Sequence, residues 1–562
     1  MVRTFITHEI RAQIELGGLW DFYPQNGNYS QKQYKLHVPG CWEEHPGFIS
    51  YRGKGVYKRN VEVGDNIRIV FKGVSHTADV FFDGKHVGHH YNAYTPFDII
   101  IKNVEYGMHE LMVEVDNSFN EESALHIPND YYTYGGIIRP VVIQFLRDVY
   151  IQYVHFTPYR NNDTWMGEIK VAVKNIGKES KDVRIVSILD DTGIQCEFDR
   201  VRVNPDEQVI LSKTFEFPGV TSYELDNPKL YLLRTGLFTK GDLLPIDDLI
   251  ERVGFREIKV IDNHIYMNDK KLFIKGFCRH EDHPQFGCAL PYQAMMYDIN
   301  LIKDMGGNAV RTSHYPNDEI FLDLCDELGI LVWEEAHARG LSEERMRHKN
   351  FRKQSLDCIE EMITNHYNHP SIFTWGILNE CASNTEYGRE CYAEQFNAIK
   401  KIDKSRPVTF ASCHYKTDIS LDLPDVVSFN VYPGWYHDTP EQDHINDVYN
   451  WVQNSTGGKG KPFIISEIGA GGIYGYRTPK KSKWSEERQA EILERQLNAV
   501  FSNENITGVF IWQFCDCRIC EEERWFAGRP RTMNNKGMVD EYRRPKLVYE
   551  TVKRIFNSVS RE

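Results

Sequence analysis

Two glutamates stand out because each follows a short apolar segment that would not tolerate a charge in its interior. Glu380 lies in "TWGILNECA" and Glu467 lies in "PFIISEIGA". Both segments read as buried strands, so each carboxyl group is expected directly beyond a strand end. Two carboxyl groups that face each other suit the hydrolysis of a glycosidic bond, in which one protonates the leaving oxygen and the other attacks the anomeric carbon. A pair of solvated loop acids is the alternative interpretation.

The order of apolar and amphipathic segments around these glutamates is typical of a barrel. From residue 257 onward, short apolar segments alternate with longer amphipathic ones such as "YDINLIKDM", "EIFLDLCDEL" and "ERQAEILERQLNAVF". The apolar segments number eight: "KLFIKG", "NAVR", "ILVWEE", "SIFTWGI", "PVTFA", "VVSFN", "PFIIS" and "GVFIW". Eight buried strands separated by helices are typical of a (β/α)8 (TIM) barrel. A doubly wound sheet is the structural alternative.

Polar residues at the ends of the predicted strands favour the barrel. In that fold the carboxyl ends of all eight strands converge on one face, where the active site lies. Seven of the eight predicted strands have polar or aromatic residues at that end: Arg279, His280 and Glu281; Ser313 and His314; Glu334 and Glu335; Asn379 and Glu380; Asn430 and Tyr432; Glu467; Trp512 and Gln513.

The first half of the chain reads as β structure. Alternating segments run from about residue 60 to 145, and Asp83-Gly84 is typical of a type I′ hairpin turn. A second all-β stretch has the length of a seven-stranded sandwich. No cluster of reactive groups is apparent in either, so both are interpreted as scaffold. The predicted domains are residues 1–147, 148–256 and 257–562.

Composition excludes several classes of protein. The formal net charge of −14 disfavours nucleic acids as partners, and no apolar stretch is long enough for a membrane span. The N-terminus lacks the pattern of a signal peptide, so a cytoplasmic location is expected. Cys515, Cys517 and Cys520 cluster in "CDCRIC", but no second CxxC completes a zinc site, and no bound metal is expected.

Several motifs together resemble glycoside hydrolase family 2, and within it the β-glucuronidases. The residues that carry the resemblance are "GFCRHED", "RTSHYP", "NHPSIFTWGILNE" and "VYPGWY" in the predicted barrel. "ADVFFDGKHVGHHYNAYTPFDI" resembles the family's sugar-binding jelly roll, while "LDNPKLYLLRT" and "ERVGFREI" resemble the end of its immunoglobulin-like domain. The resemblance covers nearly the whole chain. It implies a jelly roll, an immunoglobulin-like β-sandwich and a catalytic TIM barrel.

The resemblance also assigns roles. It implies that Glu380 is the acid/base, that Glu467 is the nucleophile and that Asn379 holds the sugar 2-hydroxyl. Retaining hydrolysis needs carboxyl groups about 5 Å apart. At that separation the charge of Glu467 is expected to keep Glu380 protonated near neutral pH until the sugar esterifies Glu467. A carboxylate pair suffices for this reaction, so no cofactor is expected.

The segment "MNNKG" near the C-terminus contains residues that could select the substrate. A site with two glutamates repels a sugar that carries its own carboxylate, and a cation must offset that charge. Lys536 supplies the cation and Asn534 supplies a directional amide donor. The Asn-x-Lys pattern resembles the uronate-recognition motif that separates β-glucuronidases from β-galactosidases and β-mannosidases of the family. An ordinary solvated turn is the alternative.

Further contacts are implied one residue at a time. Asp130 in "NDYYTYGG" is expected to reach a distal sugar hydroxyl, and Tyr432 is expected to hydrogen-bond Glu467. Tyr436, His314 and Trp512 are expected to line the pocket, although Trp512 could simply pack and His314 could act on its neighbours alone. The family's arginine four residues before the clamp asparagine is Pro530 here, with Arg529 and Arg531 on either side; Arg531 is the predicted substitute, and Arg529 is the alternative.

These features predict a retaining exo-β-glucuronidase that acts on a small-molecule or oligosaccharide glucuronide and assembles as a homo-oligomer, a dimer or a tetramer. Because the arginine has moved, a β-galacturonidase or a hybrid β-hexuronidase is the alternative. A non-catalytic carbohydrate-binding protein is a remote alternative. The short stretch "SEERMRHKNFRKQSLDCIEEMITN" implies that the long loop over the aglycone in some gut bacterial members is absent, which would favour bulky or polymeric glucuronides.

Overall fold

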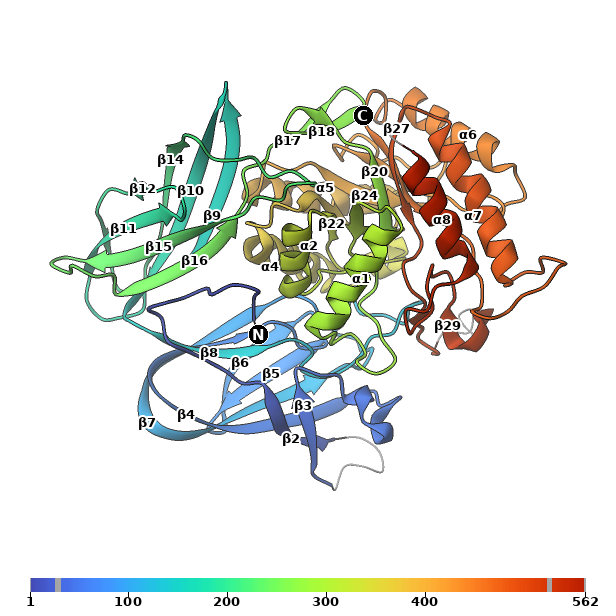
Figure 1. Ribbon diagram of the computed structural model, residues 1–562. Helices are drawn as coiled ribbons and strands as arrows, with labels where there is room; N and C mark the ends of the chain where they lie inside the picture. Colours follow the sequence, from blue (N-terminus) through green and yellow to red (C-terminus); the bar gives the residue numbers. More distant parts are fainter. Residues whose placement is uncertain (1, 26–31, 523–527, 560–562) are drawn as a thin grey trace.

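The computed structural model describes residues 2–25, 32–522 and 528–559. An N-terminal β unit and a second β unit lie beside a barrel that is surrounded by helices (Figure 1). No described helix is long and apolar enough to cross a bilayer.

The N-terminal unit is an antiparallel sheet of eight strands. Its two longest strands, β4 and β7, pair along most of their length, and their register shifts between Val63 and Ile67. Such irregularities bend a strand, which lets one half of β4 pair with β2 and the other half with β8. The predicted hairpin is confirmed, since Asp83 and Gly84 have the positive φ of a type I′ turn. The strands are β1 (Gln13–Glu15), β2 (Gly18–Pro24), β3 (Tyr34–Val38), β4 (Lys54–Phe71), β5 (Thr77–Phe82), β6 (Lys85–Tyr91), β7 (Phe97–Asp116) and β8 (Val141–Leu146), with 3-10 helices η2 (Trp42–Glu44) and η3 (Pro46–Phe48).

The middle unit consists of two sheets that share one apolar core. One sheet has the order β14-β10-β9, and in the other β11 pairs with β15 on one side and with β12 and β13 on the other. The sequence suggested seven strands, and the structure has eight because the edge beside β11 is divided into two short strands. The strands are β9 (Val149–Asn161), β10 (Thr164–Asn175), β11 (Lys181–Leu189), β12 (Ile194–Glu197), β13 (Val201–Val203), β14 (Gln208–Phe217), β15 (Tyr231–Thr239) and β16 (Asp247–Val253).

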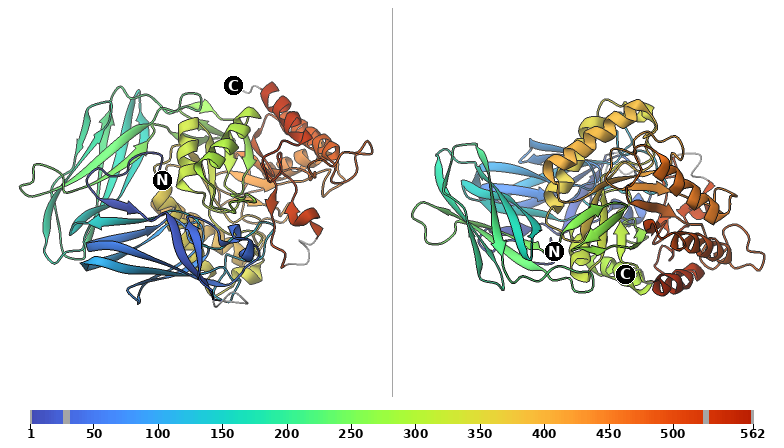
Figure 2. Two further views of the ribbon diagram at one scale, coloured as in Figure 1. Left: turned by 60° about the horizontal axis from the view of Figure 1, so that its bottom comes forward. Right: turned by 90° about the horizontal axis from the view of Figure 1, so that it is seen from above.

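The last unit contains a closed parallel barrel. All eight predicted strands are present, and β20 pairs with both β21 and β27, which excludes the open doubly wound sheet. Viewed from above, the helices lie around the outside of the strands (Figure 2). The barrel strands are β20 (Ile274–Cys278), β21 (Ala309–Arg311), β22 (Leu331–Glu335), β23 (Ile372–Ile377), β24 (Val408–Ser412), β25 (Val427–Asn430), β26 (Phe463–Ile468) and β27 (Ile506–Ile511).

Small sheets and helices complete this unit. A three-stranded sheet, β17 (Ile258–Ile261), β18 (His264–Met267) and β19 (Lys270–Lys271), precedes the barrel, and a hairpin of β28 (Cys517–Arg518) and β29 (Met533–Asn534) follows it, with the 3-10 helix η5 (Pro530–Thr532) leading into β29. The helices are α1 (Tyr292–Asp304), α2 (Glu319–Leu328), α3 (Glu343–Met346), α4 (Phe351–His366), α5 (Glu386–Ile402), α6 (Glu441–Asn454), α7 (Glu486–Phe501) and α8 (Leu547–Ser558).

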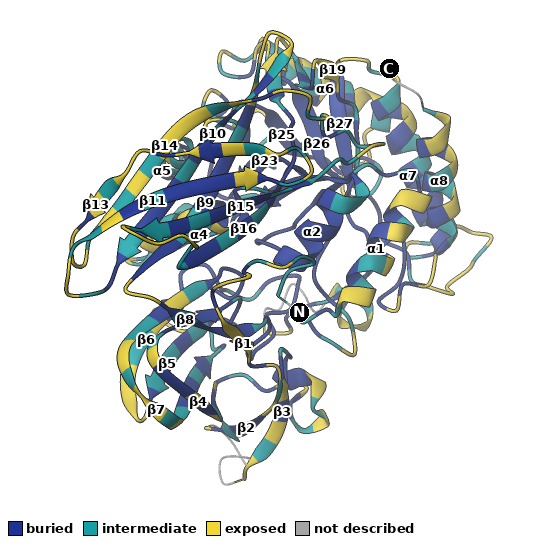
Figure 3. Ribbon diagram, turned by 60° about the vertical axis from the view of Figure 1, so that its left-hand side comes forward, coloured by how far each residue is buried: buried dark blue, intermediate teal, exposed yellow. Residues whose placement is uncertain are grey.

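Local sequence explains why α2 has the bounds that were predicted for it. The side chain of Asp318 accepts a hydrogen bond from the backbone of Ile320 and caps the first turn. Gly329 ends the helix in the left-handed conformation (φ 66°), which a side chain would strain. Between these caps the apolar residues pack against the barrel. Figure 3 shows the barrel strands buried, whereas residues along β6 and β7 of the N-terminal unit are exposed.

A buried arginine joins the N-terminal unit to the barrel. Arg139 donates to Glu281 Oε2 (2.9 Å) and to the backbone oxygens of Tyr94 (2.6 Å) and Pro316 (2.8 Å). Arg139 and Glu281 are both buried. The segment from 129 to 136, which immediately precedes this arginine, therefore has a fixed position beside the loops after the barrel strands. The proposed domain boundaries remain predictions, although β8 ends at Leu146 and β9 begins at Val149.

Substituting Arg139 should weaken the contact between these units. Arg139→Met leaves the Glu281 carboxylate buried without its partner, and breaking a buried pair in this way costs about 3–5 kcal/mol. The matched control is Lys54→Met, which removes a partly exposed ion pair with Glu114 and should cost less than about 1 kcal/mol. Urea denaturation of both variants measures the difference. Equal losses in the two variants would contradict a structural role for Arg139.

Candidate active site

The backbone after β23 directs two consecutive side chains toward the same place. In an extended strand, neighbouring side chains point to opposite faces. Here Leu378 (φ 38°) and Glu380 (φ 51°) are both left-handed, a conformation that non-glycine residues rarely adopt. As a result Asn379 Oδ1 and Glu380 Oε1 both accept hydrogen bonds from the side-chain amide of Asn430, each at 3.0 Å.

Asn379 has a defined amide orientation. Its Oδ1 accepts from Arg311 (2.8 Å) and from Asn430, so its Nδ2 must lie on the other side of the amide. That nitrogen is buried and has no hydrogen-bond partner among the described residues. A buried donor without a partner is costly, and a sugar hydroxyl would satisfy it. The geometry therefore fits the predicted contact with the 2-hydroxyl.

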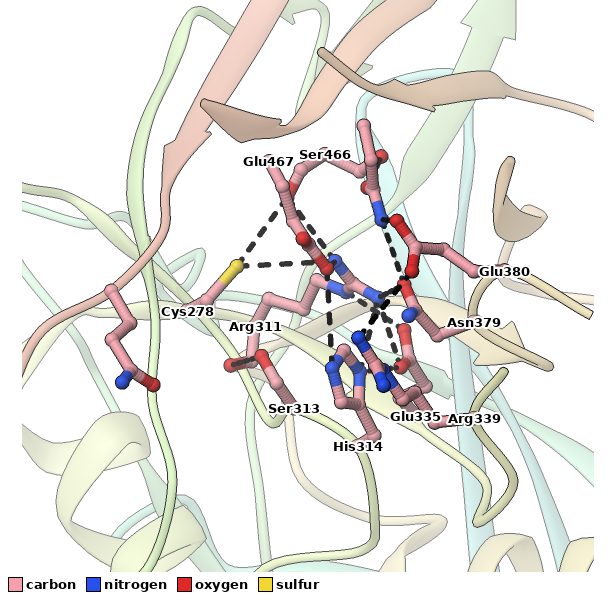
Figure 4. Close-up of polar contacts among 12 residues, drawn as sticks. Cys278, Arg311, Ser313, His314, Glu335, Arg339, Asn379, Glu380, Ser466 and Glu467 are labelled. Carbon is pink, nitrogen blue, oxygen red and sulfur yellow. Dashed lines mark hydrogen bonds and ion pairs between the residues drawn. The ribbon is translucent and has the colours of Figure 1, made fainter. Parts of the chain in front are cut away.

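Glu467 lies in β26, where the pairing with β25 shifts register between Phe429 and Asn430. Its Oε1 accepts from Arg311 Nη1 at 3.0 Å, and its Oε2 accepts from the Tyr432 hydroxyl at 2.6 Å. The predicted bond from Tyr432 is confirmed. Figure 4 shows Glu467 and Glu380 extending from different parts of the barrel toward Arg311, Asn379 and His314. Both oxygens of Glu467 are thus held in a fixed orientation.

Arg311 is the cation around which this part of the site is built, and the sequence analysis did not single it out. Its side chain is fully buried and donates to both oxygens of Glu335, at 2.8 and 2.9 Å, as well as to Glu467. These carboxylates outweigh the effect of burial and raise the pKa of Arg311. The available signal was an arginine at the end of one buried strand, "NAVR", next to a strand that ends in two glutamates.

Glu467 has a raised pKa, which the sequence did not predict. Burial raises the pKa of Glu467 to about 7, and the charge of Glu380 adds to this, whereas Arg311 and Tyr432 oppose it. The reason is that Glu467 is the more enclosed of the two: 5% of its side chain is exposed, compared with 22% for Glu380. Enclosure of Glu467 is thus the main cause of its raised pKa, and the negative charge of Glu380 acts in the same direction.

The two residues of the predicted clamp are buried, and they contact different partners. Lys536 Nζ lies 2.8 Å from the Tyr436 hydroxyl, and Asn534 Nδ2 donates to Asp130 Oδ2 at 3.2 Å. Burial and the nearby Arg529 lower the pKa of Lys536, while Tyr436 and Asp130 oppose that shift. The interpretation as an ordinary solvated turn does not fit a buried lysine, because burying an ammonium group is costly unless a partner compensates it.

Asp130 of the N-terminal unit reaches the clamp. It is buried and forms ion pairs with Arg529 (2.9 Å) and Arg339 (3.4 Å). Burial alone would raise its pKa, but Arg339, Arg529 and Lys536 outweigh this, so the carboxyl remains ionised. Arg339 also lies 3.5 Å from Glu380 Oε2. Arg339 thereby connects the candidate acid/base with the residue predicted to bind a distal hydroxyl, a connection that the sequence did not reveal.

Arg531, the predicted substrate contact, pairs with a residue outside the clamp. Its guanidinium forms an ion pair with Glu541, and 43% of its side chain is exposed. The reason is local, because Arg531 adopts a left-handed φ of 63° within η5 and so departs from the direction of its neighbours. Arg529 is the arginine in the site, where it contacts Asp130 and the Tyr436 hydroxyl (3.3 Å).

His314 and Trp512 lie together beside Glu467, the predicted nucleophile. Their rings stack with centroids 5.0 Å apart, and both residues are buried. His314 donates from Nδ1 to Glu335 at 2.8 Å, while its Nε2 lies 3.9 Å from Glu467. Burial and the nearby Arg311 lower the pKa of His314, so it is neutral. Their contact with substrate remains a prediction.

The cysteines of "CDCRIC" do not form a metal-binding group among the described residues. All three are buried, and Cys517 contacts Gln513. The single group with metal-like spacing in the described ranges is Asp323, Asp326 and His369, and the guanidinium of Arg3 already forms an ion pair with Asp323 (2.7 Å).

The pKa of Glu467 leads to a test of the pair. The nucleophile must be ionised, so kcat/KM should fall as the pH drops through about 7. Glu380→Gln removes a negative charge that raises the pKa of Glu467, so this acid limb should move to lower pH. A dinitrophenyl glycoside, whose leaving group needs no proton, keeps the variant measurable, and wild type on the same substrate is the control. An unmoved or raised limb would refute the coupling.

Comparisons with known proteins identify the family. The family model described as glycosyl hydrolases family 2, TIM barrel domain, matches residues 258–560, and the sugar binding domain of the same family matches residues 18–146. A crystal structure of a family 2 β-galacturonidase from Eisenbergiella tayi bound to galacturonate is 54% identical, covers 100% of both chains and has a TM-score of 0.96. A β-glucuronidase of Streptococcus agalactiae is 26% identical and covers 97% of this chain and 96% of its own. The structure of a β-D-glucuronidase of Dictyoglomus thermophilum is 25% identical, covers 98% of both chains and has a TM-score of 0.84. With a pair of glutamates at the mouth of a closed barrel, this chain belongs to glycosyl hydrolase family 2 and is a glycoside hydrolase.

Proposed function

We propose that this glycoside hydrolase releases a terminal β-linked hexuronic acid with retention of configuration, and that β-D-galacturonides are its preferred substrates. The observation that carries the proposal is the buried ammonium of Lys536 beside the Tyr436 hydroxyl, next to Arg529, in a site that already contains the pair of glutamates. A neutral sugar gives no reason to bury these cations. A sugar carboxylate supplies the missing counter-charge.

The first half-reaction uses both glutamates. Glu467 attacks the anomeric carbon while Glu380 gives its proton to the leaving oxygen, so a glycosyl ester forms as the aglycone departs. Arg311 and Tyr432 hold the two oxygens of Glu467 and fix its direction of attack. The second half-reaction reverses these roles, since Glu380 takes a proton from water and the water displaces Glu467 from the sugar.

Recognition of the uronate rests on charge. Two opposite unit charges 4 Å apart attract by about 4 kcal/mol at the effective dielectric of a partly solvated site. Lys536 supplies the ammonium, and Asn534, two residues earlier, supplies an amide. We assign both to the C6 carboxylate. Asn379 Nδ2 is assigned to the 2-hydroxyl.

The proposed preference for the galacturonide is supported by the difference in sequence identity between two relatives. The β-galacturonidase of Eisenbergiella tayi is 54% identical over the full length, whereas the β-glucuronidase of Streptococcus agalactiae is 26% identical. Glucuronide was the first expectation from the sequence, and β-glucuronidase activity is the second candidate because full-length relatives carry that name. The epimers differ at C4. We place this discrimination at Asp130, whose Oδ1 has no hydrogen-bond donor among the described residues, and at its neighbour Arg529.

We also propose a location, an assembly and an aglycone preference. A cytoplasmic location is proposed because the twelve cysteines are all unpaired, which suits a reducing compartment. A homo-oligomer is the expected assembly, and light scattering on the purified protein measures its mass. Only the four-residue helix α3 lies between β22 and α4, apart from connecting segments, and this short connection supports acceptance of bulky or polymeric aglycones.

A matched panel of nitrophenyl substrates tests the substrate class. We expect kcat/KM on β-galacturonide and β-glucuronide to exceed that on β-galactoside and β-glucoside by a hundredfold or more, on the order of 3 kcal/mol for a charged clamp. The galacturonide should be the better uronide, and a uronide-capped oligosaccharide should be hydrolysed as well as the aryl substrates. Equal turnover of the neutral sugars would overturn the proposal. Glu467→Gln should abolish turnover but retain binding, and unchanged turnover would argue against its role as nucleophile.

Two arginines separated by one residue give a matched comparison. Arg529→Met removes a cation from the site, so kcat/KM on both uronides should fall by at least tenfold and the preference between the epimers should change. Arg531→Met removes only a partly exposed ion pair and should leave kinetics near wild type. Steady-state kinetics on the two uronides measures both variants. Similar effects of the two changes would mean that Arg529 does not contact the substrate.

A further inference from the structure

The β28–β29 hairpin separates the clamp from a second cavity. Cys517 pairs with Asn534, and Arg518 pairs with Met533. Because neighbouring side chains of a strand point to opposite faces, the first pair and the second pair face different sides of the hairpin. Asn534 contacts Asp130 in the clamp, whereas Arg518 and Met533 line a cavity of about 400 Å³. This cavity is therefore distinct from the substrate site, although the same hairpin forms a wall of both.

Five of the six described charged residues that line this cavity are acidic. The acids come from four parts of the chain: Glu43 and Glu44 of η2, Asp282 after β20, Glu521 after β28 and Glu541 after β29. The described lining contains one cation, Arg518, which is already engaged. Its Nη1 donates to the Ile49 backbone oxygen at 2.8 Å, and its guanidinium lies 3.8 Å from the centre of the Tyr132 ring.

Glu541 has a buried oxygen that lacks a partner. This residue is 5% exposed, and its Oε1 forms the ion pair with Arg531. Its Oε2 has no hydrogen-bond donor among the described residues. Glu43 and Asp282 are buried as well, and burial raises the pKa of Glu43 to about 8 and that of Asp282 to about 6. A cationic ligand in the cavity would offset these unfavourable burials.

The spacing of the acids indicates which cation fits. No three of them bring their oxygens close enough together to form a metal-like group; the single such group in the described part of the chain lies elsewhere. Between the acids the wall is apolar or aromatic, with Ile49, Met533 and Tyr542. Separated carboxylates joined by apolar wall suit several ammonium groups joined by methylene chains.

We propose that this cavity is a binding site for an aliphatic polyamine, with ammonium groups on the carboxylates of Glu541 and Asp282 and methylene segments against Met533 and Tyr542. The bound amine contacts the hairpin that carries Asn534, so its occupancy stiffens one wall of the clamp. The site does not depend on which sugar the enzyme hydrolyses.

Calorimetric titration of the full-length protein with spermidine tests the proposal. Saturable binding with one site per chain is expected at low ionic strength, and MgCl2 at equal ionic strength should not reproduce it. Glu541→Gln removes the carboxylate with the free oxygen and should weaken binding at least tenfold. Glu179→Gln is the matched control, because this glutamate is 82% exposed in the middle unit and lies outside the cavity.

A second variant keeps the proposal testable if the Glu541→Gln protein does not fold. Ser50 is an exposed residue at the edge of the cavity, outside the substrate site, so Ser50→Lys supplies a tethered ammonium. It should abolish spermidine binding while hydrolysis stays at the wild-type rate. The proposal is overturned if spermidine does not bind, if Mg²⁺ competes equally, or if both cavity variants bind spermidine as the Glu179→Gln control does. The last result would indicate nonspecific attraction to a protein of net charge −14.

Discussion

The active site depends on one buried guanidinium. Arg311 holds Glu335 with two hydrogen bonds, Glu467 with a third and Asn379 with a fourth. Without it, two buried carboxylates would face each other uncompensated, a situation that costs several kcal/mol and would force one of them to take up a proton. Because Arg311 projects from a barrel strand whose neighbours fix its backbone, Glu467, the proposed nucleophile, is held by a rigid part of the barrel.

Charge compensation extends outward from this centre in steps. Arg339 lies between Glu380 and Asp130, and Arg529 lies between Asp130 and Tyr436. The resulting chain of alternating charges runs from the candidate acid/base to the candidate uronate clamp. Asp130 belongs to the N-terminal unit, so the candidate site combines residues of that unit and of the barrel. The buried Arg139–Glu281 pair joins the same two units.

The sequence alone determined the barrel and the position of the two candidate catalytic glutamates. Each barrel strand is a short apolar segment bounded by helical periodicity, and these signals are local, so all eight strands were predicted. Glu380 and Glu467 were identified for the same reason, since a charge directly after a strand of that kind is readable in one stretch of the chain. The Asn-x-Lys pattern was also recognisable from a few consecutive residues, and its burial agrees with a role in the site.

Tertiary structure decided which distant side chains meet. The sequence analysis singled out neither Arg311 nor Arg339, because their importance comes from carboxylates that are distant in sequence. The choice between Arg529 and Arg531 depended on a single left-handed residue, which the sequence pattern did not reveal. The raised pKa of Glu467 likewise reflects burial, a property of the assembled barrel. Apolar periodicity is encoded over a few residues, whereas desolvation and charge pairing are set by three-dimensional proximity, so only the folded chain fixes them.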